Sequence, residues 1–416
     1  MLKLFFTLTS ILLTFVASAQ YNAACNGARY QGTADFANVD TTFAVLFGSG
    51  IPNGSTTVQN LYMDIYEPAG DLATERPLIV LAFGGSFIGG TRQDMSSYCQ
   101  YYARRGYVVA TIDYRLYKGA LIPLPSSNTM TDVVIKAVGD MKAAIRFFRE
   151  DIATSNTYKI DPNFIFAGGI SAGAIAASHT AYVDSTDNIE AYVRTIIANN
   201  GGHVGNSSTN TQYSSEVTGV INFSGALRDA TYIDANDPPL FSVHDDDDQT
   251  VPYSAGWAKV FGFNIIEMEG SEAMNDTALV KNVQTELITI PASTGHVSYF
   301  NATWQDSVLT SSTRFLHDLM CPAITSTELV EGAETITAVA FPNPSFGDMT
   351  IQLSDVPSEY DVAVFDATGR LAHQVTNLSD QEINLSRQQF ATGMYFVSIQ
   401  FHDSKVRPIQ EKIIFR

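Results

Sequence analysis

The feature that most constrains the fold of this chain is a G-x-S-x-G pentapeptide, GISAG at residues 169–173. An apolar run at residues 164–167 precedes it and an alanine-rich segment at residues 174–177 follows it, which predicts a strand, a tight turn and a helix. A serine at such a turn exposes its hydroxyl, and flanking glycines leave out Cβ atoms that would collide with neighbouring backbone. Ser171 is therefore a candidate nucleophile if an acid, a base and an oxyanion site accompany it in the required order.

A candidate acid follows a second apolar run, residues 239–243, which leads into the sequence HDDDD at residues 244–248. A carboxylate just beyond the end of a strand can accept the N–H of a histidine from the next loop. The order of the motifs favours Asp248, and Asp247 and Asp246 stay as alternatives. A solvated acidic loop or a cation site is the competing interpretation of this run.

His296 is the candidate general base because it lies on a loop directly after the last predicted strand, residues 286–290. A lone histidine more often has a structural role, and the chain offers other histidines at positions 179, 203, 244 and 317. Only His296 lies on a loop directly after the last predicted strand and follows the acid, which gives the order serine, acid, histidine. We interpret His244 as support for the acid loop.

A glycine-rich loop offers donors for a negatively charged oxygen. The buried strand predicted at residues 77–83 runs directly into Gly84, Gly85 and Ser86. Backbone N–H groups of this loop, together with that of Ala172 after the nucleophile, can hold the oxyanion of a tetrahedral intermediate. An ordinary flexible turn is the alternative, but the position of the loop ahead of the nucleophile favours the oxyanion role.

With these four elements in order, the chain resembles the α/β-hydrolase superfamily, specifically secreted carboxylesterases and lipases with an HGGGF-type loop. The resemblance covers about residues 60–320 and implies an α/β fold, with helices flanking a mostly parallel central sheet. It assigns the nucleophile to Ser171, the acid to Asp248 and the base to His296, with no cofactor and no metal.

The substrate pocket is predicted to be apolar. Phe83 stands where the family has a leading histidine, and Ser86 stands where it has a third glycine. Phe83, Phe87 and Tyr114 lie on or near the C-terminal ends of predicted strands, which favours an apolar or aromatic acyl or alcohol group, with core packing as the alternative. Plant-polymer esters, lipids and synthetic polyesters all remain open as substrates.

Strands and helices alternate along this part of the chain. We predict strands at residues 61–66 and 77–83 and near residues 108, 165, 220, 240 and 288, and helices at residues 96–105, 131–150 and 304–319. Such alternation is typical of a mostly parallel sheet. The polar stretches Thr91–Gln93 and Gly201–Ser215 are expected to line or cover the pocket.

Residues 1–19 have the pattern of a signal peptide, with Lys3, an apolar run to Val16 and a small-residue exit at Ala17–Ala19. No later stretch reaches membrane-spanning length without charges, so we expect no transmembrane segment in the mature protein. The net charge of −19 argues against nucleic acid as a partner, because phosphate contacts need clusters of lysine and arginine.

The chain has three cysteines, Cys25, Cys99 and Cys321. An odd number in an oxidising compartment allows at most one disulfide. We expect Cys25 to pair with Cys99, which leaves Cys321 as the alternative partner.

A second domain is predicted beyond a polar, acidic linker at residues 323–339, which separates it from the catalytic domain at residues 20–322. The C-terminal domain at residues 340–416 contains short alternating runs, at residues 349–353, 360–365, 381–385, 394–401 and 411–415. Runs of period two with intervening turns predict a small β-sandwich.

Four motifs mark this tail: FPNP at residues 341–344, DATGR at 366–370, GMYFV at 393–397 and KIIFR at 412–416. Together they resemble the C-terminal sorting domain of the type IX secretion system of Bacteroidetes bacteria. The resemblance implies the type IX machinery as a partner and a secreted or surface-attached protein. A carbohydrate-binding or spacer sandwich is the alternative.

The sequence therefore predicts a secreted serine esterase that cleaves a small-molecule or polymer ester through an acyl-enzyme. A prolyl-oligopeptidase-like peptidase shares the residue order but adds a large N-terminal propeller, for which this chain has only about forty residues. A non-catalytic surface binding protein on the same fold has no physical need for an intact serine, acid and base.

Overall fold

The computed structural model describes residues 29–32, 34–321, 336–356, 358–366, 371–402 and 409–416. The chain divides into two compact units, one within residues 1–322 and the other within residues 323–416. Each unit has a hydrophobic core of its own. The expected signal peptide lies outside the described residues.

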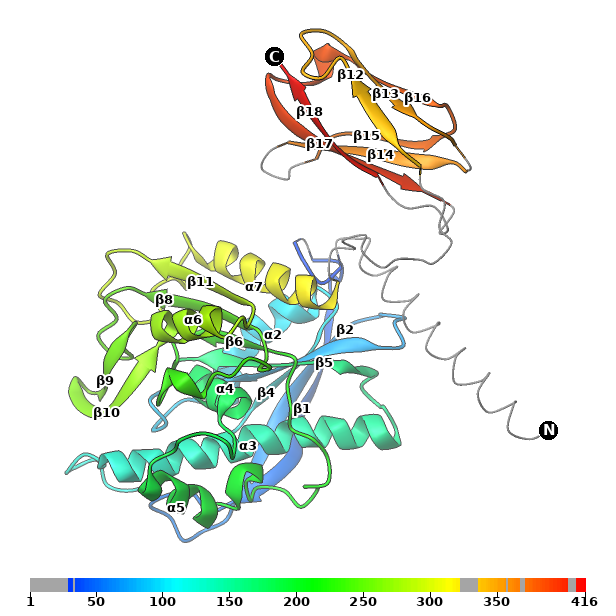
Figure 1. Ribbon diagram of the computed structural model, residues 1–416. Coiled ribbons are helices and arrows are strands. Elements are labelled where there is room, and N and C mark those ends of the chain that lie inside the picture. Colours follow the sequence, from blue (N-terminus) through cyan, green and yellow to red (C-terminus); the bar gives the residue numbers. More distant parts are fainter. Residues whose placement is uncertain (1–28, 33, 322–335, 357, 367–370, 403–408) are drawn as a thin grey trace. The chain divides into compact units, whose positions relative to one another are not determined.

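An eight-stranded sheet forms the centre of the first unit, in the order β1-β2-β4-β3-β5-β6-β8-β11 (Figure 1). The strands are β1 (Val39–Gly50), β2 (Gln59–Pro68), β3 (Arg76–Ala82), β4 (Val108–Ile112), β5 (Ile160–Ile170), β6 (Gly219–Phe223), β8 (Leu240–Asp245) and β11 (Thr285–Ile290). Only the pairs β1 with β2 and β2 with β4 are antiparallel. The mostly parallel α/β sheet that the sequence predicts is thus confirmed, with each predicted strand present.

The central strands are mostly apolar because both faces of the sheet are covered. Every residue of β3, β4 and β6 is buried, whereas the edge strand β11 is mostly half-buried. Parallel strands buried on both faces need continuous rather than alternating hydrophobic residues. The carboxyl ends of β5, β8 and β11 consequently lie at one edge of the sheet, where their following loops meet.

Helices cover both faces of the sheet. The helices α2 (Ser96–Ala103) and α7 (Gln305–Met320) lie on one face, and α3 (Ser127–Thr154) and α4 (Ala172–Tyr182) lie on the other (Figure 1). The Tyr102 hydroxyl hydrogen-bonds Ser312 at 2.7 Å and so joins α2 to α7. The α3 helix begins before its predicted start, since the Ser126 side chain accepts the N–H of Thr129 as an N-cap.

Several elements were not predicted from the sequence. These are β1, the helices α5 (Ala191–Asn199) and α6 (Ser271–Val280), and a small antiparallel sheet of order β7-β10-β9, with β7 (Ala226–Leu227), β9 (Ala255–Val260) and β10 (Phe263–Gly270). The β9–β10 hairpin turns at Phe261 and Gly262, which have φ angles of 51° and 81°. Sequence patterns predict hairpin turns from glycine, asparagine or aspartate, so a turn with phenylalanine in the left-handed conformation is missed.

The second unit consists of two antiparallel sheets, of order β12-β13-β16 and β15-β14-β17-β18. The strands are β12 (Ala338–Phe341), β13 (Met349–Leu353), β14 (Tyr360–Asp366), β15 (Leu371–Leu378), β16 (Glu382–Leu385), β17 (Gly393–Phe401) and β18 (Ile409–Phe415). The predicted runs coincide with β13, β14, β16, β17 and β18. The second unit starts before residue 340, because Ile336 belongs to its core and β12 begins at Ala338.

The expected disulfide between Cys25 and Cys99 is wrong. Cys99 is a free, fully buried thiol, and Cys321 is disulfide-bonded. The Cys99 side chain belongs to the buried face of α2, where it packs in the main core, and burial raises the pKa of its thiol. It therefore acts as a small apolar core residue.

Candidate active site

Ser171 lies at the sharp turn between β5 and α4, with φ at 54° and ψ at −116°. Its N–H donates to the carbonyl of Phe223 at the end of β6, at 2.8 Å. That bond fixes the turn to the neighbouring strand and holds a non-glycine residue in a left-handed conformation that carries strain. The serine hydroxyl is thereby presented at the carboxyl edge of the sheet.

The flanking glycines are required by close backbone approach. A Cβ atom at Gly173 would lie 2.0 Å from the carbonyl oxygen of Ala82, and one at Gly169 would lie 2.5 Å from the same oxygen. Neither contact is compatible with a side chain, because the neighbour is rigid backbone of β3. The first turn of α4 therefore packs directly against the end of β3 beside Ser171.

A continuous hydrogen-bonded chain joins the three candidate catalytic side chains. His296 Nε2 lies 2.8 Å from Ser171 Oγ, and His296 Nδ1 lies 2.6 Å from Asp248 Oδ2. The three residues come from the loops after β5, β8 and β11, which the parallel sheet brings to one edge. The geometry allows His296 to accept the serine proton while Asp248 accepts its Nδ1–H.

The carboxylate of Asp248 is held in its charged form. Burial alone would raise its pKa, but hydrogen bonds with His244 and His296 and the backbone N–H of Thr250 outweigh burial and lower the pKa to about 2. Its Oδ1 also accepts the N–H groups of Thr250 and Val251, at 2.7 and 3.1 Å. Asp248 is therefore an anion with a fixed orientation throughout the neutral range.

The alternative acids Asp246 and Asp247 do not contact His296. Asp246 accepts the backbone N–H groups of Ala292 and Ser293, at 2.8 and 2.9 Å, and so ties the acid loop to the histidine loop. Asp247 is exposed and accepts the side-chain amide of Gln249. Of the three aspartates that the sequence left open, the structure brings only Asp248 to the histidine.

Buried polar residues hold the two loops in register, and of these the sequence analysis singled out only His244. Asp245, at the end of β8, accepts the hydroxyl of Ser293 at 2.5 Å and both the N–H and the hydroxyl of Ser298. His244 supports the acid loop, as interpreted from its position, since its Nδ1 hydrogen-bonds Ser271 at 2.7 Å and its Nε2 lies 3.2 Å from the Val251 carbonyl. Ser293 and Ser298 are visible in the sequence as polar residues near His296. Their bonds to Asp245 could not be predicted, because Asp245 is distant in the sequence.

The glycine loop after β3 passes beside the nucleophile. A Cβ atom at Gly84 would lie 3.4 Å from Ser171 Cβ, and Gly85 has a φ of 120° with its Cβ position blocked by the Gly89 carbonyl. In the described part of the chain, no hydrogen bond uses the Ser86 N–H as donor. Ala172 is the first residue of α4, so its N–H has no acceptor within the helix. Two backbone donors next to Ser171 are thus available.

Two of the three aromatic residues expected in the pocket are core residues instead. Phe83 and Tyr114 are buried and stack at a centroid distance of 4.3 Å, and the Tyr114 hydroxyl donates to the Phe83 carbonyl at 2.8 Å. Gly90 closes over the Phe83 ring, since a Cβ there would lie 2.5 Å from it. Neither residue lines the pocket, whereas Phe87 does.

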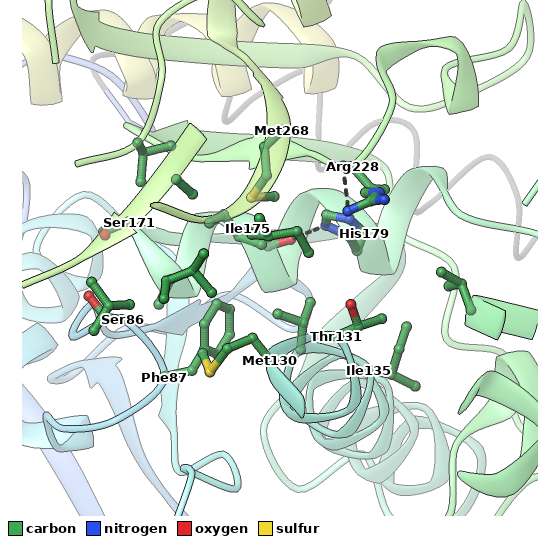
Figure 2. A pocket seen from close by; sticks show the side chains of 18 of the residues that line it. Ser86, Phe87, Met130, Thr131, Ile135, Ser171, Ile175, His179, Arg228 and Met268 are labelled. Carbon is green, nitrogen blue, oxygen red and sulfur yellow. Dashed lines mark hydrogen bonds between the residues drawn. The ribbon is translucent and has the colours of Figure 1, made fainter. Parts of the chain in front are cut away.

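An apolar cavity opens at Ser171 and encloses about 860 Å³ of empty space, part of it open to solvent (Figure 2). Figure 2 shows Ser171 and Ser86 at one end of the cavity and His179 and Arg228 toward the other. The hairpin β9–β10 and the helix α5 contribute to its walls, together with α3 and α4.

The polar stretches expected to line or cover the pocket have other roles. Arg92, within Thr91–Gln93, binds the carboxylates of Asp64 and Asp113. The stretch Gly201–Ser215 lies against α3, where Lys142 donates to the carbonyl of His203. The residues of both stretches are absent from the lining of the cavity at Ser171.

The two units of the chain match different family models. Residues 63–228 match the family model BD-FAE, and residues 339–416 match the model of the secretion system C-terminal sorting domain. The first unit therefore has the mostly parallel α/β architecture that the sequence predicts, and its residues 63–228 match an esterase family. It is a carboxylic ester hydrolase, as predicted, and the sorting domain indicates a secreted or cell-surface protein of a Bacteroidetes bacterium. In the described residues, no helix is long and apolar enough to cross a membrane.

Solved structures similar to the esterase domain include esterase 2 of Thermogutta terrifontis with bound propionate, at 21% identity and a TM-score of 0.48, covering 66% of this chain and 94% of that one. A truncated carbohydrate esterase from gut microbiota is 17% identical with a TM-score of 0.48, covering 70% of this chain and 99% of that one. No curated protein sequence matches the chain.

Proposed function

We propose that the esterase domain hydrolyses carboxylic esters through a covalent acyl-enzyme on Ser171. Ser171 Oγ attacks the ester carbonyl carbon, and its proton passes to His296 Nε2. The negative oxygen of the tetrahedral intermediate accepts the N–H groups of Ala172 and of the glycine loop at Ser86. The observation that carries the proposal is the hydrogen-bonded chain from Asp248 through His296 to Ser171, at 2.6 and 2.8 Å.

The intermediate collapses when the carbonyl re-forms and the alcohol leaves with the proton from His296. A water molecule then gives a proton to His296 and attacks the acyl carbon, and the second collapse returns the proton to Ser171 and releases the carboxylic acid. Asp248 keeps the Nδ1–H of His296 in place and stabilises the imidazolium in both halves of the cycle. No cofactor enters the scheme.

The test is the variant Ser171→Ala, with Ser185→Ala at an exposed serine as its matched control. We expect Ser171→Ala to lower kcat on p-nitrophenyl acetate on the order of 10⁶-fold and to abolish labelling by a fluorophosphonate. Ser185→Ala retains both. Wild-type turnover or labelling by Ser171→Ala contradicts the acyl-enzyme. Faster cleavage of a matched peptide anilide than of the ester favours the peptidase alternative.

We further propose that residues 1–19 direct export across the inner membrane and that the C-terminal domain directs export across the outer membrane. The match of residues 339–416 to the sorting-domain model supports the second step. Deletion of residues 336–416 is expected to retain the protein inside the cell, as measured by fractionation. Normal secretion of the truncated chain contradicts this role.

A further inference from the structure

The cavity that opens at Ser171 follows one face of α4. Its lining includes Ala172, Ile175 and His179, which lie at successive turns of this helix. Eight residues of helix rise by about 12 Å, so the cavity extends by about this length from the nucleophile. It is therefore deep enough for a chain rather than for a two-carbon group.

The walls of this cavity are hydrophobic along that length. The side chains that α3, α5 and the β9–β10 hairpin contribute are almost all aliphatic or thioether: Met130, Val134, Ile135, Val193, Ile197, Val260, Ile265, Ile266 and Met268. The lining also includes Ile189, Val193, Ile197 and Tyr232, which form a small buried hydrophobic cluster. Burial of methylene groups against such walls is favourable and non-directional.

Of the polar side chains along the cavity, Thr131 and His179 bond within the protein, whereas Lys259 lines the cavity with no partner for its ammonium group among the described residues. Thr131 donates its hydroxyl to the carbonyl of Ser127 at 2.9 Å. His179 Nδ1 lies 2.8 Å from the Ile175 carbonyl, and its Nε2 accepts the backbone N–H of Arg228 at 3.2 Å. Burial lowers the pKa of His179 to about 4, so the ring is neutral at physiological pH.

The remaining charged group at that end is also paired, since the Arg228 guanidinium binds the carboxylate of Glu190 at 2.9 Å. Neither His179 nor Arg228 therefore presents a free charge to a ligand. This arrangement favours an occupant without an ionised end.

The position of His296 indicates whether the acyl group or the alcohol group of an ester enters the cavity. The leaving alcohol takes its proton from His296 Nε2 and so lies on the histidine side of Ser171. The cavity lining includes Ser171, Ala172 and Ser86 but not His296. The cavity therefore extends from the nucleophile away from the histidine, which is the acyl side.

We propose that this cavity binds the acyl group of the substrate and that the acyl group is an unbranched aliphatic chain of up to about ten carbons. The inference rests on the proposed function and adds the substrate class to it. An extended peptide advances about 3.3–3.6 Å per residue of three backbone bonds, which is about 1.2 Å per bond. An extended alkyl chain of about ten carbons therefore spans the roughly 12 Å from Ser171 to the level of His179.

The first test is a series of p-nitrophenyl esters from acetyl to dodecanoyl, measured below their aggregation limits. We expect kcat/KM to rise roughly threefold to fourfold per added methylene up to about octanoyl or decanoyl, and to level off or fall beyond. A maximum at acetyl or propionyl overturns the inference. So does a feruloyl ester that is cleaved faster than the octanoyl ester of the same alcohol.

The second test blocks the deep half of the cavity with Ile135→Phe. Ile135 lines the cavity at the level of His179, and the larger ring occupies room that a long chain needs. The octanoyl-to-acetyl ratio of kcat/KM should fall on the order of 10-fold to 100-fold. The control Ile152→Phe makes the same change on the same helix, outside the cavity, and should keep the ratio. An unchanged ratio in Ile135→Phe overturns the inference.

These tests separate the inference from the mechanism on which it rests. If Ser171→Ala is inactive and kcat/KM does not change with chain length, the acyl-enzyme mechanism is supported and the proposal that the cavity binds an aliphatic acyl chain is refuted. If Ser171→Ala keeps activity, the nucleophile is wrong whatever the profile.

Discussion

Replacing Asp248 with asparagine tests the role of the acid without changing its shape. The Oδ1 atom of Asp248 accepts two backbone N–H groups, from Thr250 at 2.7 Å and from Val251 at 3.1 Å, while Oδ2 faces His296 Nδ1 at 2.6 Å. In Asp248→Asn the atom that faces the two N–H groups must remain an oxygen, because an amide NH₂ there would oppose two donors. The NH₂ group is therefore directed at His296.

That orientation inverts the tautomer of the histidine. The asparagine NH₂ donates to Nδ1 of His296, so the ring proton resides on Nε2, the atom that lies 2.8 Å from Ser171 Oγ. A protonated Nε2 cannot accept the serine proton, and the imidazolium loses its counter-charge. We expect kcat to fall by about 10⁴-fold, which is about 5 kcal/mol of transition-state stabilisation.

The assay is initial-rate hydrolysis of p-nitrophenyl acetate at pH 7.5, with urea unfolding as the check on the fold. The control is Asp247→Asn, the same chemical change at the adjacent exposed residue, which contacts only Gln249 among the described side chains. We expect this control to stay within about twofold of wild type. If Asp248→Asn keeps more than a tenth of the wild-type kcat, or if the control loses as much activity, the assignment of the acid is refuted.

Two further outcomes are expected. Gly173→Ala should lower the free energy of unfolding by about 2 kcal/mol or more, because its Cβ would lie 2.0 Å from the Ala82 carbonyl oxygen, whereas Gly89→Ala has open space at the Cβ and should cost less than about 1 kcal/mol in urea titrations. The folded-state pKa of Asp248, about 2, is below the ordinary value of 3.8, so its charge contributes stability above pH 3.8 that is lost as the pH falls toward 2. We expect wild type and Asp248→Asn to differ in unfolding free energy on the order of 2 kcal/mol at neutral pH, after allowance for solvent screening. This difference should vanish near pH 2. A difference that does not change with pH would contradict the stabilising role of the Asp248 charge.

The candidate site could be predicted where its signals are local in the chain. The turn at Ser171 is enclosed by two glycines and flanked by a strand and a helix, and each of those features is readable within ten residues. His296 follows from its position after an apolar strand, since parallel strands deliver their loops to the same edge. The order of elements along the sequence was therefore sufficient to predict that Ser171 and His296 lie within hydrogen-bonding distance of each other.

Packing between distant segments could not be predicted in the same way. Phe83 and Phe87 are four residues apart in one loop region, yet Phe83 stacks on Tyr114 in the core while Phe87 faces the cavity. Between them the backbone has positive φ angles at Gly85 and Ser86, and Gly90 then packs against the Phe83 ring. The cysteine pairing failed for a similar reason, because nothing in the spacing of three cysteines shows which side chain is buried in a helix face.

The hairpin β9–β10 is the largest part of the cavity that the sequence did not predict. Its strands do not alternate regularly between apolar and polar residues, and its turn uses Phe261 at a position where asparagine or glycine is the usual signal. Val260, Ile265 and Met268 on this hairpin pack in the main core and also line the cavity. Part of the acyl site that we propose is therefore built from an element with a weak local pattern, which explains why the sequence left the acyl group open.

The acidic run after β8 shows how identical side chains acquire different roles from the groups that they face. Asp245 and Asp246 bind hydroxyl and N–H groups of the histidine loop, whereas Asp248 binds its own loop and His296. The two loops are therefore joined by bonds that do not involve the pair His296 and Asp248. Removing the charge of Asp248 leaves those bonds in place, so activity and fold can be separated at this residue. The same reasoning predicts that a change at Asp245, which is fully buried and accepts bonds from Ser293 and Ser298, disturbs the fold before it disturbs the chemistry.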